Sequence, residues 1–405
     1  MSRTSHLAIL RLKPGEAARP LAGHPWIYRN EVAALPEGLE PGALVDVVDH
    51  RGRFVGRGYA NPASVILARL LTRRDEPIDE RWLADRIGRA IELRGRIRPD
   101  TTACRLVFSE GDGLPGLIID QYGDRYGDRD GGLLVVQALT AGFDRLLPVI
   151  VPILQTLCRP AAILARHDVA ARKLEGLGQE KRWLAGSHDG AVSIRWLGFD
   201  LTVDCLNGQK TGLYLDQADN YPLVDRLVAG GGRVLDGACY TGLWSLHAAR
   251  AGASEVTGID LSEEAAAAAR AHAAANGLAD RCRFISANLF DELKRRADAS
   301  ERFDVIILDP PSFVRSRARI ADALRGYKEI NLRAMKLLRP GGFLLTCSCS
   351  YHLRPELFRG LLQEAAADVG RAARLLAWRG QAFDHPSLLA VEETEYLKCA
   401  LLQVE

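Results

Sequence analysis

Short runs of alternating apolar and polar residues, separated by turn signals, fill the first 74 residues of the chain. The turn signals include Pro41-Gly42, the polar stretch from Asp49 to Gly52, and Asn61-Pro62. A period of two is typical of half-buried strands, and proline, glycine and asparagine punctuate such strands. The pattern therefore predicts a small all-β domain of the barrel type over residues 1–74.

The next two segments differ from the first in the spacing of their apolar residues. Residues 78–98 carry apolar side chains at helical spacing with charges between them, which predicts an amphipathic helix. From residue 105 to about 205, strand-length runs such as LLVVQAL and AAILARHD mix with a helical segment near 142–157. This mixture predicts a central α+β domain, which we place at residues 75–195.

From about residue 206, strand-like and helix-like segments alternate. Ser262 is placed to cap one helix, Glu263 and Glu264 suit its first turn, and Asn276-Gly277 suits its end. The expected strands are RVLDGA, EVTGIDL, RFISANL, FDVIILDPP and FLLTCS. This order predicts a C-terminal α/β domain over residues 196–405, with a doubly wound, mostly parallel sheet that binds ligands at the carboxyl ends of its strands.

Composition supports a folded, multidomain protein. The chain has 405 residues, of which 47% are hydrophobic and 26% charged, as in globular proteins. No run approaches the ~18 apolar residues of a membrane helix, and the N-terminal segment lacks the features of a signal peptide. The eight cysteines form no CxxC pair, so neither disulfides nor a bound metal is expected. We expect a cytoplasmic protein that does not bind membranes.

The glycine-containing segment VLDGACYTG (234–242) lies between an expected strand and an expected helix. Cys239 stands where a dinucleotide-binding loop has its central glycine, and Asp236 would repel phosphates. A carboxylate there suits the ammonium group of S-adenosylmethionine, which carries no phosphate. Asp260, at the end of the next strand, can accept the ribose hydroxyls.

These features alone also fit an ordinary strand–helix turn. The segment Asp309-Pro310-Pro311-Ser312-Phe313 favours a methyltransferase over that alternative. Asn288, after the third strand, can hydrogen-bond the adenine or can serve only as a turn residue. The expected cofactor is S-adenosylmethionine, and the residues expected to bind it from these patterns are Asp236, Cys239, Tyr240, Gly242, Asp260, Asn288 and Asp309.

Two cysteines in the segment TCSCS (346–350) offer a nucleophile at the same sheet edge. Carbon 5 of cytosine attacks a methyl sulfonium only after a thiolate has added to carbon 6, and an acid such as Asp309 must stabilise that adduct. Because side chains alternate along a strand, we expect Cys347 and Cys349 to face the same way and Ser348 the other, so either thiol could act. Buried, unreactive cysteines are the alternative.

Several long motifs resemble a known family, the bacterial 23S rRNA cytosine-5 methyltransferases of the RlmI type. The motifs are GHPWIYRNE (23–31), GYANPAS (58–64), EGDGLPGLIIDQYGD (110–124), ARHDVAARKLEGL (165–177), NGQKTGLYLDQADN (207–220), VLDGACYTGLWSLHAAR (234–250), LDPPSF (308–313), TCSCS (346–350) and FDHPSLLAVEETEYLK (383–398). The resemblance implies an RNA-binding PUA domain, a central α/β domain and a Rossmann-like class I methyltransferase domain that forms 5-methylcytosine in 23S rRNA.

The resemblance also implies roles for individual residues. It favours Cys349 over Cys347 as the nucleophile. It also implies a loop that closes over the cofactor, with Gln217 near the cofactor carboxylate; the loop residues are Lys210, Thr211, Gly212, Asp216 and Gln217. Departures from the family pattern are Ala218 in place of an arginine, Gly237-Ala238 in place of Leu-Phe, and Asn288 in place of an acid.

The overall net charge of +2 means that any RNA-binding surface is local. Residues 1–74 hold eleven Arg or Lys residues against six acids. Arg315, Arg317 and Arg319 follow the DPPSF segment and, with Lys210, are the expected RNA contacts. A solvated helix face is the alternative for the basic residues from Arg325 to Arg339. The oligomeric state stays open, with a homodimer among the alternatives.

Two other functions compete with cytosine-5 methylation. The DPPS tetrad resembles the loop with which methyltransferases of exocyclic amines hold their substrate, and that chemistry needs no cysteine. A non-catalytic RNA-binding assembly factor on the same fold is the second alternative, because a fold does not fix an activity. Covalent trapping on 5-fluorocytosine RNA separates the first alternative, and cofactor binding separates the second.

Overall fold

The computed structural model describes residues 7–123, 132–313 and 320–405, and the chain forms two compact units. Unit 1 comprises Met1–Trp196, Val203–Leu215 and Phe383–Thr394. Unit 2 comprises Leu197–Thr202, Asp216–Ala382 and Glu395–Glu405. Each unit is therefore built from segments that lie far apart in the sequence.

Unit 1 begins with a five-stranded sheet of order β1-β3-β4-β5-β2. Only β1 and β3 are parallel among the strand pairs described there. Leu10, Val45, Val47 and Leu67 are fully buried in its core, as the alternating pattern predicts. The elements are β1 (Ala8–Arg11), α1 (Ala18–Leu21), β2 (Trp26–Tyr28), η1 (Arg29–Glu31), β3 (Ala43–Val48), β4 (Phe54–Ala60) and β5 (Ile66–Thr72).

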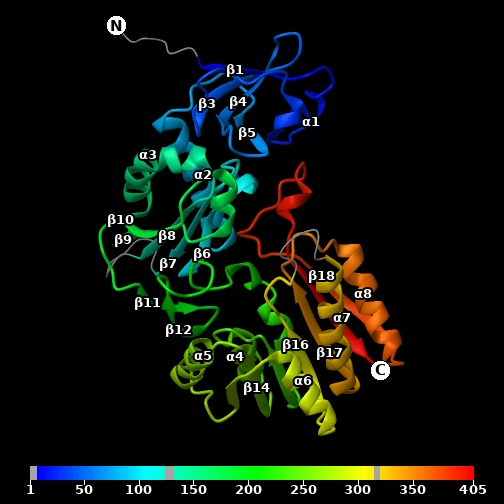
Figure 1. Ribbon diagram of the computed structural model, residues 1–405. Coiled ribbons are helices and arrows are strands. Elements are labelled where there is room, and N and C mark those ends of the chain that lie inside the picture. The colour runs from blue at the N-terminus through cyan, green and yellow to red at the C-terminus, as the bar shows by residue number, and fades with distance from the viewer. Residues whose placement is uncertain (1–6, 124–131, 314–319) are drawn as a thin grey trace. The chain divides into compact units, whose positions relative to one another are not determined.

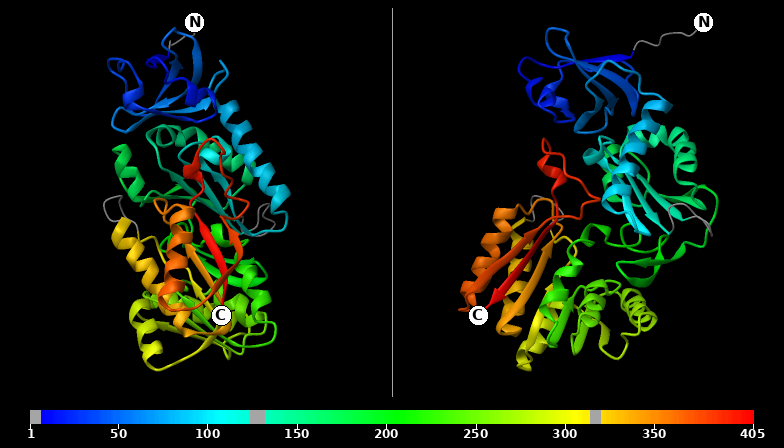
Figure 2. Two further views of the ribbon diagram at one scale, coloured as in Figure 1. Left: turned by 90° about the vertical axis from the view of Figure 1, so that its right-hand side faces the viewer. Right: turned by 180° about the vertical axis from the view of Figure 1, so that it is seen from behind.

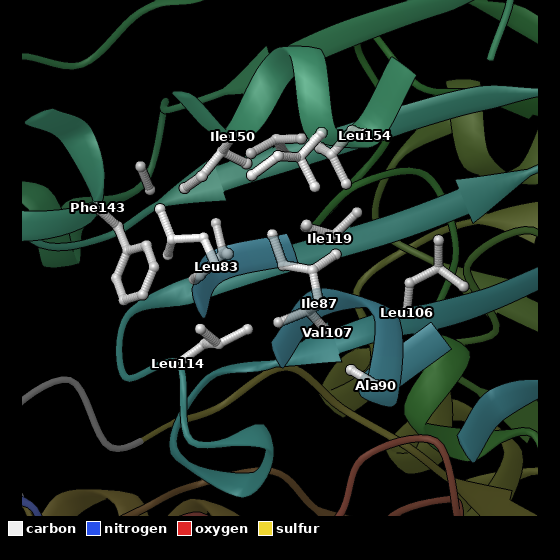
Figure 3. Close-up of a cluster of buried hydrophobic side chains, with 14 of the residues drawn as sticks. Leu83, Ile87, Ala90, Leu106, Val107, Leu114, Ile119, Phe143, Ile150 and Leu154 are labelled. Carbon is white, nitrogen blue, oxygen red and sulfur yellow. The ribbon is translucent and has the colours of Figure 1, made fainter. Parts of the chain in front are cut away.

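A second five-stranded sheet of unit 1 has the order β10-β9-β8-β7-β6, with two long helices packed on it. Figure 3 shows Ile87 of α2 and Ile150 of α3 beside Ile119 of β7 in this core. Asp79 caps α2 by accepting a hydrogen bond from the Trp82 N–H. The elements are α2 (Glu80–Ile97), β6 (Ala103–Phe108), η2 (Ser109–Asp112), β7 (Leu117–Tyr122), β8 (Leu133–Ala138), α3 (Ala141–Cys158), β9 (Ala162–Arg166), η3 (Ala170–Glu175) and β10 (Lys181–Ala185).

Helix α3 is, among the described residues, the one helix whose length and apolar composition would suit a membrane span. Its residues Phe143, Ile150 and Leu154 are fully buried against the second sheet of unit 1. A buried core helix passes the same test, and the packing of α3 accounts for its apolar character. The strands β11 (Ala191–Trp196) and β12 (Phe199–Asp204) follow as a two-stranded sheet.

Unit 2 contains a seven-stranded sheet of order β15-β14-β13-β16-β17-β19-β18. The first five strands run parallel, and β19 pairs antiparallel with both β17 and β18. Figures 1 and 2 show α4 and α5 on one face and α6, α7 and α8 on the other. This arrangement confirms the predicted doubly wound, mostly parallel sheet.

The boundaries in unit 2 follow local sequence signals. Ser262 caps α5 by accepting from the Ala265 N–H, and Asn276 ends that helix, as predicted. Strand β17 begins five residues before the predicted FLLTCS run and ends at Ser348. The elements are η4 (Leu215–Gln217), η5 (Tyr221–Leu227), β13 (Arg233–Gly237), α4 (Leu243–Arg250), β14 (Glu255–Asp260), α5 (Glu263–Ala275), β15 (Cys282–Ser286), α6 (Leu289–Asp298), β16 (Phe303–Leu308), α7 (Ile320–Leu337), β17 (Leu338–Ser348), α8 (Pro355–Asp368), β18 (Ala373–Arg379), η7 (Glu392–Thr394) and β19 (Lys398–Val404).

Candidate active site

The strand order of unit 2 reverses between β13 and β16, and the carboxyl ends of these parallel strands form one sheet edge. Ligands of doubly wound folds bind at such a switch point. Asp236 lies near the end of β13, Asp260 ends β14, and Asp309 directly follows β16. The structure therefore brings the three predicted acids to one edge of the sheet.

The loop that joins β13 to α4 has an unusual backbone. Ala238 and Tyr240 have φ values of 62° and 48°, and Gly242 has a φ of 86°. Left-handed conformations cost a non-glycine residue about 1–2 kcal/mol. Two hydrogen bonds stabilise these left-handed residues. The Cys239 N–H donates to the Ile259 carbonyl, and the Tyr240 N–H donates to Asp260 Oδ2 at 2.8 Å. Strain of this kind gathers at ligand-binding loops.

Asp260 is tied at both carboxylate oxygens. Oδ2 accepts from Tyr240, and Oδ1 accepts from the Ser262 N–H at 3.0 Å. An ionised carboxylate has about four acceptor positions, so two backbone donors leave room for two hydroxyl donors. This geometry fits the predicted contact with a ribose.

Asp236 is fully buried, and its two carboxylate oxygens have different surroundings. Oδ2 accepts from the Ser245 hydroxyl at 2.6 Å, whereas Oδ1 has no hydrogen-bond partner among the residues that the structure describes. Burial, together with the charges of Asp309 and Asp260, raises the pKa of Asp236 to about 7. A buried acceptor of this kind fits the ammonium group of S-adenosylmethionine.

Asp309 is oriented by two side chains from other elements. Gln217 Nε2 donates to Asp309 Oδ2 at 2.9 Å, and Trp244 Nε1 donates to the same oxygen at 3.1 Å. Gln217 is itself buried, and its Oε1 accepts from Asn220 Nδ2 at 2.7 Å. Gln217 and Asp309, which lie 92 residues apart, therefore belong to one hydrogen-bonded group.

Two predicted cofactor residues have structural duties of their own. The Cys239 thiol is buried, and a Cβ on Gly258 would lie 3.0 Å from it, so the side chain packs beneath the loop. Cys239 can therefore meet a cofactor only through its backbone. Asn288 is exposed and caps α6, since its Oδ1 accepts from the Phe290 N–H at 2.9 Å. The sequence analysis gave two alternatives for Asn288, an adenine contact or a turn residue, and this hydrogen bond corresponds to the second.

The two candidate nucleophiles lie in different surroundings. Cys347 lies within β17 opposite Cys399 and is fully buried, and burial and the neighbouring Cys399 thiol raise its pKa well above the ordinary value. Cys349 follows Ser348, the last residue of β17, and is only partly buried. Strand β17 ends at Ser348, so the alternation from which a shared face of the two thiols was predicted does not extend to Cys349.

Polar side chains form hydrogen bonds around Ser350, the residue that follows Cys349. Ser350 Oγ lies 2.8 Å from both Ser312 Oγ and Tyr327 Oη. Lys398 Nζ donates to the carbonyl oxygens of Ser350 at 2.7 Å and Tyr396 at 2.8 Å. Burial lowers the pKa of Lys398 to about 8, and the nearby Cys349 opposes this shift electrostatically. Lys398 also pairs with Ser348, the residue before Cys349, so its buried amine lies near the Cys349 segment.

Sequence reasoning missed this role of Lys398, and it also missed Ser245 and Trp244. Lys398 of β19 pairs with Ser348 of β17, and local sequence patterns do not predict this pairing. The available signal was the motif FDHPSLLAVEETEYLK, which ends at Lys398. Ser245 and Trp244 lie within the quoted motif VLDGACYTGLWSLHAAR.

The predicted RNA contacts divide into three groups. Arg315, Arg317 and Arg319 lie outside the described residues. Lys210 belongs to unit 1, and its Nζ lies 4.4 Å from the centroid of the Tyr214 ring. The basic residues on and after α7 pair with acids, as in the Arg325–Asp322, Lys328–Asp368, Arg333–Glu329 and Arg339–Asp304 ion pairs. These pairings favour a solvated helix face there.

Comparisons with known proteins agree with this geometry. A model of PUA-like domains matches residues 10–73, and a model of S-adenosylmethionine-dependent methyltransferases matches residues 144–401. The ribosomal RNA large subunit methyltransferase I of Shewanella amazonensis is 40% identical over 98% of this chain and 99% of its own length. The protein of that name from Klebsiella pneumoniae is 38% identical over 96% of both chains.

The chain belongs to the ribosomal RNA large subunit methyltransferase I family. It has an N-terminal PUA-like domain and a Rossmann-like methyltransferase fold, and it depends on S-adenosylmethionine. A Streptococcus mutans protein described as an S-adenosylmethionine-dependent methyltransferase has the same fold, with a TM-score of 0.82, 20% identity, and coverage of 98% of this chain and 100% of its own. A methyltransferase solved with S-adenosylhomocysteine gives a TM-score of 0.84 at 20% identity, over the same shares of the two chains.

Proposed function

We propose that this member of the methyltransferase I family forms 5-methylcytosine in 23S rRNA, with Cys349 as the nucleophile. The substrate class rests on the family, whose members from Shewanella and Klebsiella are named for ribosomal RNA of the large subunit. The position of Cys349 carries the chemical part of the proposal. A partly buried thiol lies at the ligand-binding edge of the sheet beside a buried lysine, whereas Cys347 is sealed within the sheet.

In the proposed reaction, the Cys349 thiolate gives an electron pair to carbon 6 of the cytosine, which makes carbon 5 nucleophilic. Bound S-adenosylmethionine supplies the electrophilic methyl group. After carbon 5 has taken the methyl group, its proton leaves to a base, the bond between carbon 6 and sulfur breaks, and the electron pair returns to Cys349. Asp309, held by Gln217 and Trp244, is the acid that stabilises the adduct.

The proposed role of Lys398 is to favour the thiolate form of Cys349. An ammonium group beside a thiol stabilises its anion, and the thiolate is the reactive species. The backbone bonds from Lys398 to Ser350 and Tyr396 fix the cation in place without neutralising it with a carboxylate.

Covalent trapping tests the proposal. With 23S rRNA that contains 5-fluorocytosine, the wild-type protein and S-adenosylmethionine should give a complex that survives a denaturing gel, because fluorine at carbon 5 blocks release. Cys349→Ala should abolish both the complex and methyl transfer while binding of cofactor and RNA persists. Cys347→Ala should still form the complex, and if Cys347 releases the product, this variant should accumulate it on ordinary RNA as well.

Other outcomes would point to the competing functions. Methyl transfer by the Cys347→Ala, Cys349→Ala double variant at the wild-type rate would exclude the covalent mechanism and favour methylation of an exocyclic amine by way of the Asp309–Ser312 segment. RNA binding without methyl transfer to any RNA, in protein that binds S-adenosylmethionine, would favour an assembly factor.

A further inference from the structure

Unit 1 contains a cavity of about 440 Å³ that plays no part in the site described above. The end of β5, the middle of α2 and the turn η2 line it, so the PUA-like domain and the following helix both contribute. Its volume lies within the range of about 300–1,000 Å³ typical of small-ligand sites. The cavity therefore has room for a group the size of one nucleotide.

Three arginines line this cavity: Arg73, Arg86 and Arg89. The Arg86 guanidinium lies 5.0 Å from the centroid of the Trp82 ring, and a Cβ on Gly113 would lie 3.6 Å from its Nη1. Burial, followed by repulsion from Arg89, lowers the pKa of Arg86. Arg86 therefore lies near two like charges, Arg89 and Arg74, and one opposite charge, Glu76, and a bound anion would relieve the repulsion.

The acids of the cavity already have partners. Asp112 forms a bidentate ion pair with the fully buried Arg94, and Glu110 accepts from Trp26 Nε1 at 2.8 Å. Among the described residues, no ion pair within 4.0 Å joins Arg86 or Arg89 to a carboxylate. Arg73 uses its Nε to donate to the Pro20 carbonyl at 2.9 Å, which leaves its other donors for a ligand. Glu110 keeps its negative charge beside the three arginines, so the lining presents a net positive charge.

Apolar side chains also line the cavity. Leu70, Leu93, Pro115 and Leu388 contribute to it. Apolar walls beside a cluster of guanidinium groups suit a ligand with a charged end and a flat uncharged end, as in a nucleotide of single-stranded RNA. Arginine matches phosphate well because its planar fork gives two parallel hydrogen bonds.

We infer that Arg73, Arg86 and Arg89 bind a backbone phosphate of the substrate RNA, with the adjoining nucleotide in the cavity. This inference rests on the proposed RNA substrate and adds a second RNA contact, in unit 1, to the active site in unit 2. The contact would hold the RNA without taking part in methyl transfer.

The test measures binding of a fluorescein-labelled transcript of 23S rRNA to the full chain by anisotropy over a range of salt concentrations. Arg86→Ala, Arg89→Ala should lower affinity roughly tenfold or more and reduce the slope of log K against log salt by about 0.7 for each phosphate that is no longer neutralised. Arg81→Ala, Arg96→Ala is the matched control, because both residues are exposed on α2 and neither lines the cavity. Affinity for S-adenosylmethionine should not change in either variant.

Equally weakened binding in the two double variants would overturn the inference, since it would reflect overall charge and not this cavity. Wild-type affinity in Arg86→Ala, Arg89→Ala would overturn it as well and would leave the proposed function standing. A wild-type protein that does not bind the transcript would overturn both. Calorimetric titration with adenosine monophosphate separates the two sources of phosphate, because tight binding that depends on Arg86 and Arg89 would assign the cavity to a free nucleotide and not to RNA.

Discussion

Asp236 is fully buried, its Oδ1 has no hydrogen-bond partner among the described residues, and its pKa lies at about 7. A cofactor ammonium group would bind the ionised carboxylate, so we expect affinity for S-adenosylmethionine to rise between pH 6 and about pH 7.5. Asp236→Asn should bind weakly and should lose this rise. Calorimetry at several pH values compares the two proteins, and titration of the ligand itself is common to both.

The raised pKa of Asp236 also affects the stability of the fold, and measuring that stability provides the control for the binding experiment. Because the folded protein binds a proton at Asp236 more tightly than the unfolded chain does, the unliganded protein loses stability as pH rises from about 4 to about 7. Asp236→Asn removes that loss, so at pH 8 it should unfold at a temperature no lower than the wild type. A lower unfolding temperature would show a structural defect and would invalidate the binding comparison.

Asp260 is expected to hold the ribose, and it also holds the strained loop through Tyr240. Asp260→Ala should weaken S-adenosylmethionine binding by roughly 1.5–3 kcal/mol, the cost of losing hydrogen bonds to a charged group. Asp260→Asn keeps the shape and one acceptor oxygen, so it should lose less. Unchanged affinity in folded Asp260→Ala protein would remove this residue from the cofactor site.

At the scale of the element, the turn from β13 to α4 depends on Gly242. Its φ is +86°, and a Cβ there would lie 3.0 Å from Ala269 Cβ of α5 and 3.1 Å from the Phe284 ring of β15. Gly242→Ala should therefore add crowding to backbone strain and cost about 1–3 kcal/mol. Gly277→Ala is the matched control, because its φ is +67° but nothing lies within 4 Å of a Cβ. Denaturant midpoints that shift equally in both variants would contradict the role assigned to this packing.

Local signals account for what the sequence could predict of these elements. Periodicity and capping residues predicted both ends of α5 to within one residue. The order of strands and helices predicted the parallel sheet. The sequence pattern did not predict the contacts between segments that lie far apart in the chain. The pairing of β19 with β17 brings Lys398 beside Cys349, and the early end of β17 separates the surroundings of the two cysteines. For Asn288, by contrast, the observed hydrogen bond is local. Its side chain caps α6, which is one of the two roles that the sequence indicated.

At the scale of the whole molecule, unit 1 is completed by a segment near the end of the chain. Asp384 is buried and accepts from the Arg105 N–H at 2.9 Å, and its carbonyl accepts from Arg94 Nη2 at 2.8 Å. Asp384→Ala should destabilise unit 1 by about 1–3 kcal/mol, because a buried backbone donor loses its partner. Affinity for S-adenosylmethionine should persist, since the expected cofactor residues belong to unit 2. Hydrogen exchange on β6 and α2 would report the change, and wild-type protection there would contradict it.

The sequence separation within unit 1 also has a consequence for synthesis on the ribosome. Arg94 and Asp384 are 290 residues apart, so an N-terminal half that has left the exit tunnel still lacks the Asp384 carbonyl to which Arg94 Nη2 donates. At about 5–20 residues per second, the wait is roughly 15–60 seconds. During this time the chain of β6 to β10 lacks the segment Phe383–Thr394 that completes unit 1, so chaperones that bind exposed nascent chains can act there. Translational pauses within the codons for unit 2 should lengthen that exposure and lower the yield of folded protein.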